Sequence, residues 1–248
     1  MSQVFDAYSG YYDLLYQDKD YVAEIAYIEK LLKRHGDNIH ELLEFGSGTG
    51  IHGSLLAEAG FRVTGIELSQ EMVNRATFTD GFSSRQGDIR SLNLNRSFDA
   101  VISLFHVMSY QVTNPDIQTT LSNAAGHLLP GGLFIFDFWY SPAVYTQNPV
   151  VRVKRMESDK LNITRIAEPK MYPNENRIDV KYTVYAQESL SKECQVFEEV
   201  HPMRHFSLPE IDLLADQAGF QKVAAEEFIT GAVPGENTWG VCVVLCKK

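Results

Sequence analysis

Cysteine is scarce in this sequence, and the three cysteines present are odd in number and lack the spacing of metal ligands: Cys194, Cys242 and Cys246. The seven histidines also form no pair with zinc-ligand spacing. We therefore expect neither a disulfide framework nor a bound metal. Membrane-length apolar runs and an N-terminal signal segment are absent too, so we expect a cytoplasmic protein without a membrane partner.

Positive charge is also in short supply. The 248-residue chain has 22 Lys and Arg against 32 Asp and Glu, a net charge of −10. An acidic surface repels a phosphate backbone at long range, so we expect no nucleic-acid partner, although the same charge would serve solubility alone. Hydrophobic residues make up 44% of the chain, which is ordinary for a globular protein able to bury a large core.

Short apolar runs alternate with helical patterns over the first 140 residues. The expected strands are Glu41–Phe45, Arg62–Ile66, Ser83–Gln86, Phe98–Ser103 and Gly132–Asp137. The expected helices are Asp20–Lys33, Gly50–Ala59, Gln70–Ala76 and Asp116–Leu129. This alternation predicts an α/β fold, with helices on both faces of a parallel sheet.

The pattern changes to that of β-hairpins between Val150 and Phe206. Apolar and polar residues alternate from Ile178 to Val184, as in a half-buried strand, and we expect about four antiparallel strands here. Ser207, with Glu210 three residues later, is typical of a capping box that starts a helix. Two final strands are expected at Lys222–Ile229 and Val241–Cys246.

A glycine-rich turn follows the first expected strand, with glycines at 46, 48 and 50 around Ser47. Glycine allows a tight turn and lets a ligand approach the backbone without meeting a Cβ atom. Glu44 lies at the strand end directly before the turn, where its carboxylate would repel a pyrophosphate. It would attract the ammonium and sulfonium groups of S-adenosylmethionine.

Two further acids follow the next two strands. Glu67 can accept hydrogen bonds from ribose hydroxyls, and Asp88 can accept one from the adenine amine, with Met72 and Ile89 offering apolar faces to the ring. Each acid alone is more often a solvated loop residue, but the three strand ends meet at one edge of a parallel sheet. A nicotinamide-dependent oxidoreductase would use the glycines and Glu67 while leaving Glu44 and Asp88 unexplained. A non-catalytic S-adenosylmethionine-binding protein is the other alternative.

Together these segments resemble the ordered motifs of class I S-adenosylmethionine-dependent methyltransferases. The motifs are Glu44–Gly50, Gly65–Ser69, Gln86–Asp88, Phe98–Ser103 and Leu129–Phe134. The resemblance implies a Rossmann-like, doubly wound sheet of seven strands whose last strand is antiparallel. It divides the chain into an N-terminal helical flap (1–38), a catalytic domain (39–140 and 207–248) and an antiparallel β insertion over the acceptor pocket (141–206).

Within that superfamily the chain looks most like the amino-sugar N,N-dimethyltransferases. The N-terminal tyrosines, the stretch around Trp139 and the hairpin insertion carry this likeness. Two positions depart from that group, which has a histidine where Tyr110 stands and an arginine near Trp239. The resemblance implies methyl transfer from S-adenosylmethionine to a nitrogen or hydroxyl of a small polar metabolite, an amino sugar being the first candidate. Exposed sheet edges in the insertion also suggest a homodimer.

The expected site residues fall into three groups. The cofactor-binding set is Tyr12, Tyr21, Glu44, Gly46, Ser47, Gly48, Gly50, Glu67, Leu68, Met72, Asp88, Ile89 and Leu104. The catalytic set is Tyr16, His106 and Tyr110, in which His106 could be a base, since histidine is the usual general base near neutral pH, or could only bond to backbone. The substrate-binding set is Trp139, Arg204 and Trp239, although an arginine at position 204 would more often face solvent than the pocket.

Overall fold

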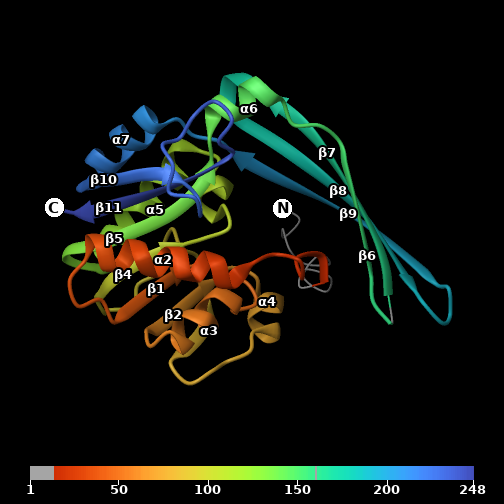
Figure 1. The fold of residues 1–248 in the computed structure, drawn as a ribbon, viewed down its shortest axis with the longest axis horizontal. Coiled ribbons are helices and arrows are strands. Elements are labelled where there is room, and N and C mark those ends of the chain that lie inside the picture. The colour runs from red at the N-terminus through yellow and green to blue at the C-terminus, as the bar shows by residue number, and fades with distance from the viewer. Residues whose placement is uncertain (1–13, 160) are drawn as a thin grey trace.

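The computed structural model describes residues 14–159 and 161–248 and contains two β-sheets (Figure 1). The larger sheet has seven strands in the order β10-β11-β5-β4-β1-β2-β3. Its strands are β1 (Glu41–Phe45), β2 (Arg62–Glu67), β3 (Phe82–Gln86), β4 (Phe98–Ser103), β5 (Leu128–Trp139), β10 (Phe220–Glu227) and β11 (Gly240–Lys247). β11 runs antiparallel to both of its neighbours, and the pairings from β5 to β3 are parallel. The doubly wound, seven-stranded sheet expected from the sequence is confirmed.

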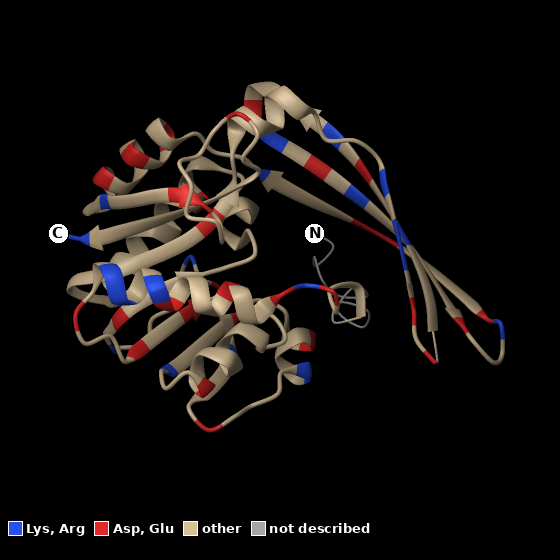
Figure 2. Ribbon diagram, in the orientation of Figure 1, with Lys and Arg blue, Asp and Glu red and all other residues tan. Residues whose placement is uncertain are grey.

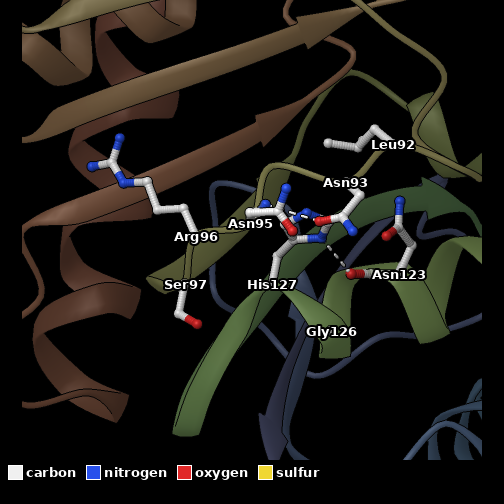
Figure 3. Close-up of a pocket in the computed structure, with 8 residues that line it drawn as sticks. All are labelled: Leu92, Asn93, Asn95, Arg96, Ser97, Asn123, Gly126 and His127. Atoms are coloured by element: carbon white, nitrogen blue, oxygen red, sulfur yellow. Dashed lines mark hydrogen bonds between the residues drawn. The ribbon is translucent and has the colours of Figure 1, made fainter.

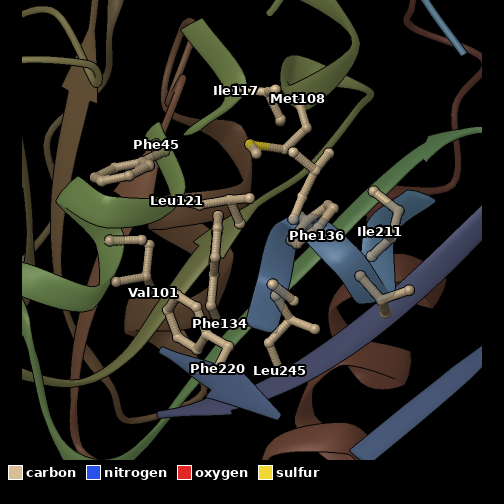
Figure 4. Packing of buried hydrophobic residues seen from close by; sticks show 14 of the residues in the cluster. Phe45, Val101, Met108, Ile117, Leu121, Phe134, Phe136, Ile211, Phe220 and Leu245 are labelled. Carbon is tan, nitrogen blue, oxygen red and sulfur yellow. The ribbon is translucent and has the colours of Figure 1, made fainter. Parts of the chain in front are cut away.

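Helices cover both faces of this sheet. They are α2 (Tyr21–His35), α3 (Ile51–Glu58), α4 (Gln70–Arg75), α5 (Asn114–Gly126) and α7 (Leu208–Gln217). The 3₁₀ turn η1 (Val107–Tyr110) follows β4, while α6 (Ser141–Gln147) and the 3₁₀ turn η2 (Pro173–Glu175) lie against the second sheet. β5 is buried on both faces. Phe134 and Phe136 pack with α5 and α7 (Figure 4), whereas Leu133 and Ile135 on the other face pack with α2. A strand buried on both sides has a continuous run of apolar residues, so the position of β5 could be predicted from the sequence.

Two expectations about helix ends are wrong. The helix expected to reach Leu129 ends at Gly126, because His127 caps it and β5 begins at Leu128. The capping box at α7 does not form either. Ser207 occupies the N-cap position without a side-chain cap bond, and Glu210 accepts a hydrogen bond from Arg204 instead.

The second sheet has four antiparallel strands in the order β6-β7-β8-β9, and we refer to it as the arm. Its strands are β6 (Arg152–Glu157), β7 (Leu161–Tyr172), β8 (Arg177–Glu188) and β9 (Cys194–Arg204). In Figure 1 the arm projects from the larger sheet on the side of α6. This confirms the antiparallel strands expected between Val150 and Phe206.

The inward face of the arm is the face that carries Ile163, Val184 and Ala186. These side chains bury Leu15, which precedes α2, in a small apolar cluster of its own. At the base of the arm, Tyr140 forms a β-bridge with Phe206. The arm is thus joined to the larger sheet at its base and to the segment before α2 further along. No helix among the described residues is both long and apolar enough to cross a membrane.

Candidate active site

The glycine turn between β1 and α3 needs glycine for steric as well as conformational reasons. Gly46 has φ +72°, and a Cβ atom there would lie 2.5 Å from Cγ2 of Val107 in η1. Gly50 has φ +83° at the N-cap of α3. The N–H groups of Gly46 and Ser47 both donate to the carbonyl of Ile66, which fixes the turn against β2. The backbone therefore approaches η1 too closely for any side chain at residue 46.

Two of the predicted acids lie at this turn. Glu44 is 1% exposed, and its Oε2 has no hydrogen-bond partner among the described residues. Burial, reinforced by the nearby carboxylate of Glu67, raises the pKa of Glu44 to about 8. Glu67 accepts hydrogen bonds from the N–H groups of Gly48 (3.0 Å) and Ser69 (2.8 Å). Burial raises the pKa of Glu67 as well, against the lowering effect of these bonds.

A buried carboxyl oxygen without a hydrogen-bond partner is suited to a cationic ligand that donates a hydrogen bond to it. S-adenosylmethionine carries such a cation, so the residues present fit this cofactor. Two apolar neighbours support this assignment. Leu68 is 62% exposed directly after Glu67, and the sulfur of Met72 lies 3.7 Å from where a Cβ atom of Gly48 would be. Both would offer apolar contact to a nucleoside held by Glu67.

Other residues of the predicted cofactor set have different surroundings. Asp88 forms a salt bridge with Arg90, which lowers the pKa of the Asp88 carboxyl, so an adenine amine would share that acceptor. The hydroxyl of Ser47 pairs with that of Ser84 on β3 at 2.8 Å. Ile89 and Leu104 are buried in the two cores on either side of the sheet. Tyr12 lies outside the described residues.

Tyr21 belongs to a charged cluster that the sequence analysis missed. The ammonium of Lys19 forms a salt bridge with Glu24 and lies 3.3 Å from Nε2 of His52, which is itself 2.7 Å from the Glu24 carboxylate. Lys19 also lies over the ring of Tyr21, 4.1 Å from its centroid. Burial lowers the pKa of Lys19, against the opposing effect of Glu24. A signal was present, because a glutamate among the apolar positions of α2 requires a partner.

The structure pairs His106 with Asp137, a second residue without a predicted role. Nδ1 of His106 lies 2.6 Å from Oδ2 of Asp137, and the backbone N–H of His106 donates to Oδ1 at 3.0 Å. Burial would raise the pKa of Asp137, but its neighbours His106 and Lys19 lower it below the usual range. A carboxylate at this distance fixes the orientation of an imidazole ring. Phe105 and His106 both have positive φ, +63° and +62°, as strained residues at functional sites often do.

His106 lines a pocket of about 400 Å³ at the carboxyl edge of β4 and β5. The rings of Trp139 and Trp239, both predicted to bind substrate, meet there at 90° with centroids 6.2 Å apart. The remaining lining residues are Glu227, Phe228, Thr230, Asn237 and Gly240. This brings together three predicted site residues: His106 directly before η1, Trp139 at the end of β5 and Trp239 directly before β11.

Arg204, the third predicted substrate ligand, is not in this pocket. Its guanidinium donates to Glu210 at 2.6 Å and lies over the ring of Phe206. The residue is buried rather than facing either solvent or the pocket, because the carboxylate of α7 holds it. Its role as a substrate ligand stays a prediction, and the contacts that the structure gives it are with Glu210 and Phe206.

A second pocket, of about 510 Å³, opens at the opposite edge of the sheet, before β4 and β5 (Figure 3). His127 is the histidine in its lining, with Nδ1 2.8 Å from the carbonyl of Asn123 and Nε2 accepting the N–H of Leu94. Both ring nitrogens thus serve the backbone. This histidine holds the chain before β4 in place and is far in the fold from the glycine turn.

Tyr16 and Tyr110, the remaining catalytic candidates, contact the inward face of the arm. The hydroxyl of Tyr16 accepts a hydrogen bond from Arg165 at 3.0 Å, and its ring meets Phe105 edge-on at 5.0 Å. The hydroxyl of Tyr110 lies 2.8 Å from Nδ1 of His201 on β9. The arm therefore contributes polar side chains beside η1, next to the edge of the sheet that carries the glycine turn.

Comparison with known proteins agrees with this geometry. Residues 42–132 match the family model described as Methyltransferase domain. The chain is 28% identical to the dTDP-3-amino-3,4,6-trideoxy-alpha-D-glucopyranose N,N-dimethyltransferase of Streptomyces venezuelae, over 91% of this chain and 93% of that protein. It is 29% identical to the dTDP-3-amino-3,6-dideoxy-alpha-D-glucopyranose N,N-dimethyltransferase of Streptomyces fradiae, over 91% and 87%.

Among solved structures, an S-adenosylmethionine-dependent methyltransferase from Clostridium acetobutylicum ATCC 824 has the same fold, with a TM-score of 0.82 and 19% identity over 97% of both chains. The nicotinamide-dependent alternative lacks support from these likenesses. The glycine turn, the partnerless Glu44 and the matched motifs agree on one cofactor. The chain is an S-adenosylmethionine-dependent methyltransferase that is similar to the amino-sugar N,N-dimethyltransferases.

Proposed function

We propose that this enzyme transfers a methyl group from S-adenosylmethionine to the amine of a small amino sugar. The sequence likeness to two amino-sugar N,N-dimethyltransferases supports the proposal, because it covers 91% of the chain and so includes the arm. The observation that carries it is the pocket at the edge of β4 and β5. There two perpendicular tryptophan rings lie beside His106 and its partner Asp137.

Aromatic walls of this kind suit an amino sugar. Tryptophan faces attract ammonium groups and pack against the apolar side of a pyranose ring. Glu227 adds an acidic side chain to the lining, and the eight lining residues include neither lysine nor arginine. The pocket therefore favours a neutral or cationic group over a phosphate. The proposal assigns Trp139 and Trp239 to the sugar, and Tyr16, His106 and Tyr110 to the reacting amine.

When bound, the cofactor supplies an electrophilic methyl carbon, so that an attacking amine forms the N–C bond as the C–S bond breaks. The protein's main contribution is to hold the amine in line, an effect worth up to about 7–11 kcal/mol in well-oriented systems. Glu44 and Glu67 would hold the ammonium and the ribose, and Lys19 would order the segment before α2 through its contacts with Glu24 and His52. An amine must also arrive neutral, so a nearby group has to accept its proton.

We also propose a homodimer formed through the outward face of the arm. Val153, Tyr185, Val196 and Val200 are each at least 40% exposed, and β6 and β9 are sheet edges. Acidic and basic positions are interspersed along the arm strands (Figure 2), which suits a protein surface better than a phosphate backbone. A cytoplasmic location accords with three cysteines that are all free. Light scattering of the purified protein would test the dimer.

The test of the function is an acceptor assay. The purified protein is incubated with S-adenosylmethionine and dTDP-3-amino-3,6-dideoxy-α-D-glucopyranose, the free amino sugar, or the 3-hydroxy analogue, and products are followed by mass spectrometry. Methylation of either amine, with none of the hydroxyl analogue, supports the proposal. Methylation of the hydroxyl analogue alone would overturn it. A Trp239→Ala variant should raise KM for the amine with little effect on cofactor affinity.

A further inference from the structure

Two side chains on the inward face of the arm and one in η1 form a chain of hydrogen-bonding groups: Glu199, His201 and Tyr110. Oε2 of Glu199 lies 3.2 Å from Nε2 of His201, and Nδ1 of His201 lies 2.8 Å from the Tyr110 hydroxyl. His201 is 1% exposed, and the Glu199 side chain is 9% exposed. Resting on the proposed amine acceptor, we propose that Glu199, His201 and Tyr110 form a proton relay that deprotonates the incoming ammonium.

The order of the three groups fixes which atom carries each proton. An ionised Glu199 can only accept, so it favours the His201 tautomer with hydrogen on Nε2. Nδ1 is then a bare acceptor for the hydroxyl of Tyr110. Proteins activate a hydroxyl by placing an imidazole next to it and a carboxylate next to the imidazole, with about 2.6–3.2 Å between neighbouring groups. The imidazole takes the hydroxyl proton, so the hydroxyl oxygen can accept another.

The proton moves as follows. An N–H proton of the substrate ammonium passes to the Tyr110 oxygen, while the hydroxyl proton of Tyr110 passes to Nδ1 of His201. The products are a neutral amine, an unchanged tyrosine and an imidazolium paired with Glu199. The imidazolium returns its proton to solvent before the next turnover. Tyr110 is thus the catalytic residue that touches the amine, and His201 and Glu199 are positioning residues that act through it.

The surroundings of His201 favour this role. The ring of Tyr182 on β8 meets it edge-on at 4.8 Å, and the guanidinium of Arg165 on β7 lies over Tyr182, 5.0 Å from its centroid. Burial raises the pKa of Tyr182, so that neighbour stays neutral. Glu199 is an acidic side chain in direct contact with the imidazole. His106, by comparison, has Asp137 on its Nδ1 side, and its ring faces Trp139 in the pocket.

The experiment combines single-turnover transfer between pH 6 and 9 with imidazole ¹⁵N NMR. The acceptor is dTDP-3-amino-3,6-dideoxy-α-D-glucopyranose, and the variants are Tyr110→Phe, His201→Gln and Glu199→Gln. We expect the first two each to slow transfer by roughly 10²–10⁴ and to remove the limb of the pH profile that belongs to the base. The double variant should be no slower than either single one, because the residues act as one unit.

Glu199→Gln should slow transfer less and move that limb to lower pH, because it removes the charge that stabilises the imidazolium. Calorimetry should show unchanged cofactor affinity in all variants. His127→Gln, a buried histidine at the opposite edge of the sheet, is the matched control and should behave as the parent. If His201→Gln fails to fold, Tyr110→Phe and Glu199→Gln still decide the question.

Three results would overturn the relay. In the first, the Tyr110 and His201 variants transfer methyl at the parental rate with the parental pH profile, while His106→Gln loses the limb of the pH profile that belongs to the base. Another is additive losses in the double variant. The third does not depend on any acceptor: an NMR spectrum in which Nδ1 rather than Nε2 of His201 carries the hydrogen. A parent enzyme that binds the cofactor but methylates neither amine refutes the proposed function instead, and the NMR result then still tests the relay.

Discussion

Cofactor binding should release a proton from Glu44. Burial and the neighbouring Glu67 raise the pKa of this carboxyl from 4.5 to about 8, so about nine-tenths of the molecules carry the proton at pH 7. A cationic ligand beside the partnerless Oε2 favours the ionised form. The proton must then leave as the ligand binds.

The size of the effect follows from the pKa. If binding requires the carboxylate, the apparent affinity for S-adenosylmethionine should rise about twentyfold between pH 6 and pH 7.5 and level off above pH 8. Titration calorimetry in phosphate and in Tris, which differ in ionisation enthalpy, counts the protons released. We expect close to one at pH 7 for the parent and almost none for Glu44→Gln. The cofactor's own amine also titrates near pH 8, and the variant subtracts its contribution.

The same shift makes a prediction about stability without the cofactor. The folded-state pKa of Glu44 lies above its unfolded value, so its contribution is fully present below about pH 4.5 and is lost as the pH rises through 8. At about 1.4 kcal/mol per pKa unit, the loss is on the order of 5 kcal/mol. Denaturant titrations should show Glu44→Gln more stable than the parent at pH 8.5 and similar at pH 5. Two results together would refute the raised pKa of Glu44: equal heats of cofactor binding to the parent in phosphate and in Tris, and no gain in stability for Glu44→Gln at pH 8.5.

Three further substitutions test the packing around the site. Gly46→Ala should lower the free energy of unfolding by roughly 2–4 kcal/mol in denaturant titration. Adding Val107→Ala should recover only the part of this loss that comes from the overlap of the new Cβ atom with Val107, since the positive φ at residue 46 remains. Asp137→Asn keeps the shape but removes the charge beside His106, so single-turnover transfer should fall roughly tenfold to a hundredfold while calorimetric cofactor affinity holds; an equal loss of affinity would contradict this. Leu15→Ala, under the arm, should cost about 2–5 kcal/mol, and a thermal scan matching the parent would show that this contact does not stabilise the fold.

Much of the fold could be predicted because local patterns carry it. β1 and β4 begin and end where the sequence analysis placed them, since each is a buried apolar run bounded by polar residues. The arm was visible from alternation alone, as Ile178 and Val180 are buried and their neighbours are not. The end of α5 was missed because it depends on His127, whose partner at Leu94 is 33 residues away.

The acids of the site were predictable for a different reason. Parallel strands end at one edge, so Glu44 and Glu67 had to meet wherever the alternation held. Asp137 was missed although a signal existed: a lone carboxylate within the apolar run Phe134–Phe138 needs a partner once buried. The identity of that partner, His106, depends on how η1 turns back against β5, and no local pattern encodes that turn.

The register of the arm determines whether it can take part in chemistry at all. Val180 pairs with His201 and Tyr182 with Glu199, which places the histidine and the glutamate on the inward face. Because side chains alternate along a strand, a slip of one residue would turn both outward. The hairpins at either end of β8 therefore determine the surroundings of Tyr110, although they are distant from it in the chain. An insertion of one residue in the turn between β8 and β9 should abolish the Tyr110–His201 hydrogen bond while leaving the glycine turn and cofactor binding intact.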